Sequence, residues 1–89
     1  MTYFVYILQS QKDGSYYKGY TSDTAKRLDK HNSGLSIYTS KKCPWKLIYT
    51  EEQLDKLSAI RRERILKNYS REKLEALIAS PKNLMNKMA

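Results

Sequence analysis

Several side chains of this sequence are of types that act on phosphate groups. The stretch YYKGY, residues 16–20, precedes an arginine and a histidine that lie four residues apart, Arg27 and His31. The planar guanidinium of Arg27 suits a phosphate because it offers parallel donors to two oxygens. The imidazole of His31 can accept a proton or bind phosphate near neutral pH. A tyrosine phenol titrates at about 10, so it acts as a base only where its phenolate is stabilised.

Each of these residues also has a purely structural interpretation. A helix arginine is most often a solvated side chain, and an isolated histidine most often lies on a surface or at a helix end. Most of the eight tyrosines are expected to be half-buried sheet aromatics, Tyr3 and Tyr49 among them. The spacing of four between Arg27 and His31 favours a shared role, because it places both on one face of a helix.

A β-hairpin is predicted to carry the tyrosines. Residues 3–8 and 16–20 are rich in aromatic and β-branched side chains, and the turn pair Asp13-Gly14 lies between them. Because side chains alternate along a strand, Tyr17 and Gly19 share one face, which leaves room beside Tyr17.

The arginine and the histidine fall on a short helix predicted over residues 24–32. Ser22 and Asp23 are good N-cap residues, and the segment 32–34, NSG, is a good C-terminal stop. After a polar, basic loop, Pro44 leads into a third strand over 45–50. In that strand the predicted alternation sets Trp45, Leu47 and Tyr49 against Lys46, Ile48 and Thr50.

Two further helices complete the predicted domain. The first spans about 54–69, with an apolar face of Leu54, Leu57, Ile65 and Tyr69. Ser70 caps the second, over 71–79, and a polar tail over 80–89 is expected to be frayed. The predicted fold is α+β, a small three-stranded sheet flanked by helices in the order ββαβαα, forming a single domain over 1–79.

Composition narrows the class of protein. Lys and Arg number 17 and Asp and Glu number 9, a net charge of +8 that is spread along the chain and favours polyanionic partners. A single cysteine, Cys43, excludes an internal disulfide and, with one histidine, a Cys/His zinc site. No apolar run approaches the roughly 20 residues that cross a bilayer, so we expect a cytoplasmic protein without a membrane partner.

Five segments together resemble the GIY-YIG nuclease superfamily in its small, single-domain form. They are FVYIL, YYKGYTSD, RLDKHN, PWKLIYTEE and AIRRERILKNYSREK, and they extend over residues 3–78. The resemblance is specific because an arginine, a histidine, a Pro-Trp strand and a helix glutamate all keep their places. It implies a three-stranded sheet flanked by helices and a metal-dependent cut of one phosphodiester bond.

The resemblance assigns site residues one at a time. Tyr6 in FVY resembles the tyrosine of the family's first tripeptide, and Tyr17 in YKG resembles that of the second. Arg27 matches the family's helix arginine, His31 stands where relatives place a histidine or a tyrosine, and Glu63 matches the metal-holding carboxylate. The resemblance implies that Tyr17 activates the attacking water while Tyr6 hydrogen-bonds nearby.

Two positions depart from the family pattern. Lys18 replaces the apolar middle residue of the second tripeptide, and no glycine precedes Val5 and Tyr6. Both positions flank a tyrosine without supplying its hydroxyl, so they bear on local packing more than on chemistry. No residue matches an asparagine that some relatives use near the scissile phosphate.

Glu63 is expected to hold one Mg²⁺ or Mn²⁺ ion. A single carboxylate with mostly water ligands suits Mg²⁺, which prefers oxygen and gives up water reluctantly. Ala59, Ile60 and Leu66 lie beside Glu63 on the predicted helix, so the carboxylate is expected to be semi-buried. The alternative is an ordinary ion pair with Lys67, four residues further on.

Basic residues supply candidate contacts to a nucleic-acid backbone, with a solvated face as the alternative. These candidates are Lys18, Lys41, Lys42, Arg61, Arg62 and Arg64. The leading hypothesis is a metal-dependent endonuclease acting on DNA, with branched or nicked DNA as candidate substrates and with specificity that is either low or supplied by a protein partner. The alternatives are a nucleic-acid-binding module of the same fold that cuts poorly or not at all, and a protein-interaction domain with a basic surface.

Overall fold

A computed structural model describes residues 2–34 and 39–87 of the chain. The elements are β1 (Tyr3–Ser10), β2 (Tyr16–Thr21), α1 (Thr24–Asn32), the 3-10 turn η1 (Ser40–Lys42), β3 (Trp45–Gln53), α2 (Lys56–Lys67), α3 (Arg71–Ile78) and the 3-10 turn η2 (Leu84–Lys87). The strands form one antiparallel sheet in the order β2-β1-β3. The predicted α+β fold is confirmed. Residues 35–38 of the predicted basic loop lie outside the described residues.

The β1–β2 hairpin forms around the predicted Asp13-Gly14 turn. Gly14 has a φ of +79°, which glycine adopts without steric cost, and its N–H donates to the Ser10 carbonyl. Pairing of the two strands continues to Gln9 opposite Tyr16. Because the strand order is β2-β1-β3, β1 lies at the centre of the sheet and β2 is an edge strand.

Side-chain caps set the starts of the three helices. Asp23, Asp55 and Ser70 each accept a hydrogen bond from a backbone N–H three residues later. The caps at Asp23 and Ser70 agree with the predicted starts of α1 and α3. Asp55 starts α2 at Lys56, slightly later than predicted.

A bulge in β3 corrects the predicted alternation of that strand. The β1–β3 register passes from Ile7 opposite Tyr49 to Leu8 opposite Leu47, which leaves Ile48 as an extra residue. Tyr49 therefore packs with Ile7 on one face of the sheet, and Leu47 packs near Leu8 on the other. The prediction that Leu47 and Tyr49 share a face is wrong, because the extra residue inverts the alternation.

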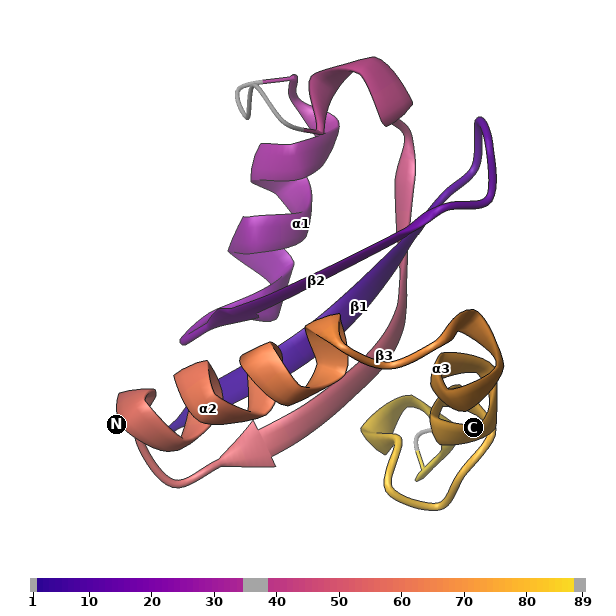
Figure 1. Ribbon diagram of the computed structural model, residues 1–89. Helices are drawn as coiled ribbons and strands as arrows, with labels where there is room; N and C mark the ends of the chain where they lie inside the picture. The colour runs from indigo at the N-terminus through magenta and orange to yellow at the C-terminus, as the bar shows by residue number, and fades with distance from the viewer. Residues whose placement is uncertain (1, 35–38, 88–89) are drawn as a thin grey trace.

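Helices cover both faces of the sheet (Figure 1). α1 packs through Leu28 on the face that carries Tyr6 and Trp45, and α2 packs through Leu66 on the face that carries Val5. In Figure 1 the edge strand β2 runs between α1 and α2. Residues of both helices can therefore meet at this edge.

α2 turns a different face toward the sheet from the one predicted. Three of its predicted core residues are exposed, with 89%, 55% and 50% of the surface of Leu54, Leu57 and Ile65 accessible, whereas Ala59 and Leu66 are fully buried. Tyr69, also predicted on that face, lies beyond the end of α2 and does pack against the core cluster that contains Ala59 and Leu66. The predicted apolar face of α2 is wrong because the small Ala59 lets the helix backbone approach the sheet closely. The side of α2 that carries Ala59 and Leu66 is therefore the buried one.

The segment after α3 packs against the sheet over the residues that the structure describes. Asn83 is 1% exposed, and its amide group bonds the backbone of Ile48, Thr50 and Ile78. Asn83, within the segment expected to be frayed, is thus tied to β3 and α3, while 88 and 89 lie outside the described residues. None of the helices in the described part has the length and apolar character needed to cross a membrane.

Candidate active site

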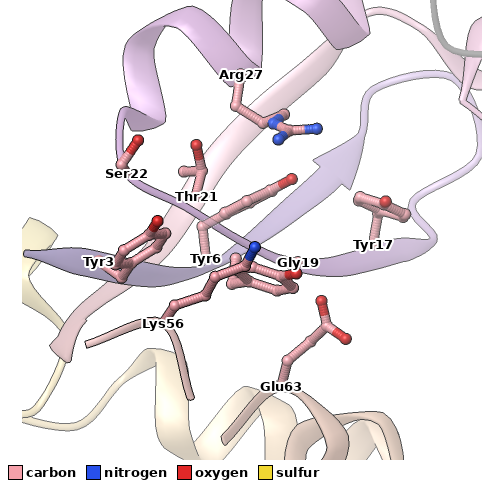
Figure 2. A pocket seen from close by; sticks show the side chains of 10 residues that line it. Tyr3, Tyr6, Tyr17, Gly19, Thr21, Ser22, Arg27, Lys56 and Glu63 are labelled. Carbon is pink, nitrogen blue, oxygen red and sulfur yellow. The ribbon is translucent and has the colours of Figure 1, made fainter. Parts of the chain in front are cut away.

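An open pocket of about 380 Å³ lies at the β2 edge, with walls from β1, β2, α1 and α2 (Figure 2). Tyrosines supply much of its lining, namely Tyr3, Tyr6, Tyr17 and Tyr20. A concave surface that combines aromatic rings with a few polar groups is typical of a ligand site.

The pocket brings together four of the predicted site residues, Tyr6, Tyr17, Arg27 and Glu63. They come from four different elements, β1, β2, α1 and α2 in that order. Figure 2 shows the Arg27 guanidinium above the Tyr6 hydroxyl and the Glu63 carboxylate on the opposite wall. A cation and a carboxylate therefore face each other across a pair of phenols.

His31, the fifth predicted residue, does not line the pocket. It is 2% exposed, with Nε2 3.1 Å from the Tyr6 hydroxyl and Nδ1 2.8 Å from the Thr39 hydroxyl. Burial, and then the charges of Arg27 and Lys30, lower the pKa of His31 from its usual value. Of the two roles expected of this imidazole, accepting a proton or binding phosphate, the enclosed ring favours the first, because it borders the pocket through Tyr6 and Tyr17 and does not line it.

Tyr6 occupies the space that the sequence left open beside Tyr17. Its ring lies against Gly19, the residue opposite it in the β1–β2 pairing. Burial raises the pKa of the Tyr6 phenol, the neighbouring Tyr17 raises it further, and the positive Arg27 opposes the rise. Tyr6 is therefore a protonated phenol held against a neutral imidazole.

Tyr17 contributes a second phenol with different surroundings. Its ring packs edge-on against the ring of His31, with 4.8 Å between centroids, and lies 6.1 Å from the ring of Trp45. In the part of the chain that the structure describes, its hydroxyl has no hydrogen-bond partner. This hydroxyl is available to a molecule in the pocket.

Glu63 is semi-buried, as expected, and forms the ion pair with Lys67 that was the alternative to a metal site. Its side chain is only 14% exposed and lines the pocket, and one carboxylate oxygen lies 3.0 Å from the Lys67 ammonium. The side chain of Lys67 is 56% exposed, so it can leave the carboxylate for solvent at little cost. The ion pair and a cation site are thus alternatives for the same carboxylate.

The donor set around the pocket fits some metals and excludes others. Nowhere among residues 2–34 and 39–87 do three His, Cys, Asp or Glu side chains come together. One carboxylate beside phenol and serine hydroxyls does not supply the ligands of a structural zinc site. It does fit a hydrated Mg²⁺ or Mn²⁺ ion that takes most of its ligands from water and a bound phosphate.

The predicted backbone-binding residues do not form one surface. Arg62 is only 17% exposed and pairs with the buried Glu51, so it is removed from the candidates. Lys41 and Lys42 lie beside the β1–β2 turn, where Lys42 pairs with Asp13. That turn lies at the far end of the hairpin from the pocket.

The remaining basic candidates flank the site in different ways. Arg61 and Arg64 are exposed on α2, and Lys18 is half-buried on β2. Sequence reasoning missed Lys56, which lines the pocket, and Thr39, which holds His31. The signal for Lys56 was its place seven residues, two helical turns, before Glu63. Nothing in the sequence pointed to Thr39.

The fold and the pocket together define a class: a small α+β domain whose sheet edge carries a pocket lined by tyrosines, cationic side chains and one carboxylate. The chain matches the GIY-YIG catalytic domain over residues 2–75. It therefore belongs to the GIY-YIG family.

Individual relatives agree with this assignment. The chain is 42% identical over 80 residues to the UPF0213 protein BH0048 of Halalkalibacterium halodurans, covering 89% of this chain and 84% of that protein. It is 41% identical over 78 residues to the UPF0213 protein SSP2268 of Staphylococcus saprophyticus, covering 86% of this chain and 94% of that protein. The solution NMR structure of UPF0213 protein BH0048 from Bacillus halodurans is similar with a TM-score of 0.59 and 40% identity, covering 92% of this chain and 87% of that one.

Proposed function

We propose that this protein is a metal-dependent endonuclease that hydrolyses phosphodiester bonds of DNA. The observation that carries the proposal is the hydrogen bond between the Tyr6 hydroxyl and His31, at a pocket that also holds Arg27 and Glu63. Hydrolysis needs a base for the water and positive charge near the phosphoryl oxygens. The pocket contains both kinds of group, and membership of the GIY-YIG family supports the reaction class.

The proton of the attacking water passes to His31 through Tyr6. Because Tyr6 remains protonated, its hydroxyl donates to Nε2 of the neutral imidazole, and Nδ1–H donates to the Thr39 hydroxyl. As the water attacks phosphorus, Tyr6 takes the water's proton and releases its own proton to Nε2. The P–O bond to the departing sugar oxygen breaks, and that oxygen takes a proton from the solvent that reaches the open pocket. The phenol thus transfers a proton without a free phenolate having to form beforehand.

Tyr6 therefore replaces Tyr17 as the proposed base. The resemblance suggested Tyr17, but the imidazole that can receive the proton is hydrogen-bonded to Tyr6. The unpartnered hydroxyl of Tyr17 is suited to orient the water or a phosphate oxygen. Both phenols act in the site, in different roles.

Arg27 and Glu63 provide the remaining electrostatics. The guanidinium of Arg27 binds the non-bridging oxygens of the scissile phosphate with parallel donors. Glu63 would hold a Mg²⁺ or Mn²⁺ ion, after displacement of Lys67, and GIY-YIG nucleases generally use divalent metals. Such an ion, when bound, acts as a Lewis acid that polarises a phosphoryl oxygen.

A second candidate function is a nucleic-acid-binding module that does not cut. The Glu63–Lys67 ion pair favours it, because the carboxylate already has a cationic partner. The semi-buried position of Glu63 in the pocket favours the enzyme.

Cleavage assays separate these functions. The protein is incubated with labelled duplex, nicked, branched and single-stranded DNA, with and without Mg²⁺ or Mn²⁺. We expect metal-dependent cutting of at least one substrate, and an approximately 10²-fold or greater loss in Tyr6→Phe with little change in DNA affinity. Tyr16→Phe is the control, since Tyr16 packs on the other face of the sheet and against Arg71. Binding without cutting under either metal would establish the module instead.

A further inference from the structure

We propose that Lys56 holds the backbone phosphate adjacent to the one that is cut, so that the pocket binds two consecutive phosphates. This inference rests on the proposed nuclease function and names a contact that the resemblance did not assign. Its evidence is the position of Lys56, the charge balance of the pocket and the spacing along α2.

Lys56 and Arg27 reach the pocket from opposite walls. Lys56 is the first residue of α2, directly after the Asp55 cap, and Arg27 belongs to α1. Figure 2 shows the Lys56 ammonium extending toward the strands from the α2 side, while the Arg27 guanidinium approaches from the α1 side. Both residues line the pocket. A molecule bound there therefore meets a cation on each side.

The charges of the pocket are not balanced within the described residues. Neither Arg27 nor Lys56 forms an ion pair there, since the pairs that occur join other residues. Glu63 is the lining carboxylate, and Lys67 already neutralises it. Two unpaired cations at one concave surface favour an anionic ligand, and a phosphodiester backbone brings one charge at each phosphate.

The position of Lys56 relative to Glu63 points to the neighbouring phosphate rather than the reacting one. The two residues are seven apart on α2, so their backbone positions lie on the same side of the helix and about 10 Å apart along its axis. That separation exceeds the size of one phosphate group. A backbone with its scissile phosphate between Arg27 and Glu63 therefore places an adjacent phosphate near Lys56.

This position predicts a distinct kinetic role for Lys56. The adjacent phosphate does not change its charge during the reaction, so Lys56 stabilises the bound DNA and the transition state equally. Its loss should weaken DNA binding and raise KM, and it should leave kcat nearly unchanged.

The test compares Lys56→Ala and Lys56→Arg with Lys46→Ala, all measured with a fluorescein-labelled forked DNA. Lys46 is an exposed lysine on β3, at the opposite edge of the sheet from the pocket. We expect Lys56→Ala to weaken DNA binding about tenfold and to lower the steepness of the log–log salt dependence by about 0.7–0.9. Lys56→Arg should keep most of the parent's DNA affinity. Lys46→Ala should show neither the tenfold loss of DNA affinity nor the rise in KM.

Neutralising single phosphates identifies the contact. Forked DNAs carrying one methylphosphonate, which removes the charge of one phosphate, are prepared with the substitution moved along the strand around the cut. At the phosphate adjacent to the cut, the substitution should weaken binding to the parent but not weaken binding to Lys56→Ala any further. At other phosphates, the loss of binding free energy caused by the methylphosphonate should add to the loss caused by Lys56→Ala.

Three outcomes would overturn the inference. These outcomes are an affinity and salt dependence of Lys56→Ala equal to the parent's, an effect that adds to that of every methylphosphonate, or a lower kcat without a higher KM. Failure of the proposed function is distinguishable, because the parent itself would then not cut the forked DNA under Mg²⁺ or Mn²⁺, whether or not it binds, and a contact defined relative to the cut would fall with it. If the parent cuts the DNA and Lys56→Ala binds and cuts it equally well, only the Lys56 contact is overturned.

Discussion

Gly19 lies directly opposite Tyr6 in the β1–β2 pairing, and a Cβ atom at Gly19 would stand 2.5 Å from the Tyr6 hydroxyl oxygen. It would also stand 2.7 Å from the ring carbon that carries this hydroxyl. Real Cβ atoms do not approach side chains this closely. The glycine is therefore required by the position of Tyr6, which in turn contacts His31.

Gly19→Ala should displace the Tyr6 ring and break its hydrogen bond to His31. We expect a loss of about 1–3 kcal/mol in the free energy of unfolding, typical of an overpacked interior, and loss of cleavage. Urea unfolding and the cleavage assay measure the two effects.

The double variant Gly19→Ala with Tyr6→Phe tests the cause of that loss. Removing the hydroxyl removes the nearest clashing atom, so stability should partly return while cleavage should not. If the two changes were simply additive in stability, the contact between Gly19 and Tyr6 would not be the source of the strain.

The buried imidazole of His31 should make stability depend on pH. Its pKa is lower in the folded protein than in the unfolded chain, so the unfolded chain binds the proton more readily. Its contribution is complete above the usual value of 6.5 and is lost as pH falls from there through the folded pKa. We expect the free energy of unfolding to decrease from about pH 7.5 to about pH 5.5, and cleavage to decrease with it as the imidazole loses its acceptor.

His31→Gln isolates this contribution from the carboxylates. The variant should show a smaller decrease in stability over the same pH range, measured by urea unfolding at each pH. An identical decrease in both proteins would assign the pH dependence to other groups.

Removing Lys67 should strengthen metal binding at Glu63. The Lys67 ammonium competes with a divalent ion for the carboxylate, and a half-exposed pair of this kind is worth up to about 1 kcal/mol. Lys67→Gln should raise Mn²⁺ affinity about two- to fivefold, measured by paramagnetic broadening of NMR signals near Glu63. Lys46→Gln removes a distant lysine as control, and broadening confined to other regions would exclude Glu63 as the metal ligand.

Asn83→Ala should destabilise the whole domain. The Asn83 amide donates to the carbonyls of Ile48 and Ile78 and accepts from the N–H of Thr50, and the variant leaves these buried groups unpaired. We expect a loss of about 2–4 kcal/mol, measured by thermal or urea unfolding. Lys82→Ala is the control, since Lys82 is an exposed residue of the same segment. A loss no larger than that of the control would show that the segment after α3 is dispensable.

Local signals in the sequence were sufficient for the hairpin and for two helix starts. The Asp13-Gly14 turn, the Asp23 cap and the Ser70 cap depend on hydrogen bonds and backbone angles within a few residues of each other. Such interactions are present in the sequence pattern itself, so they can be predicted without knowledge of the rest of the chain. The types of group that could act on phosphate were also evident, although Lys56 and Thr39 were not.

Burial was decided only by the tertiary structure. The inner face of α2 was mispredicted because apolar periodicity favoured Leu57 and Ile65, while the sheet accepts the helix where Ala59 permits close approach. Likewise, the helical spacing of Arg27 and His31 placed both on one face, yet the sheet and Thr39 enclose the imidazole and leave the guanidinium in the pocket. Which of two neighbouring side chains meets solvent depends on elements distant in sequence that pack over it, and a pattern along one segment carries no record of those elements.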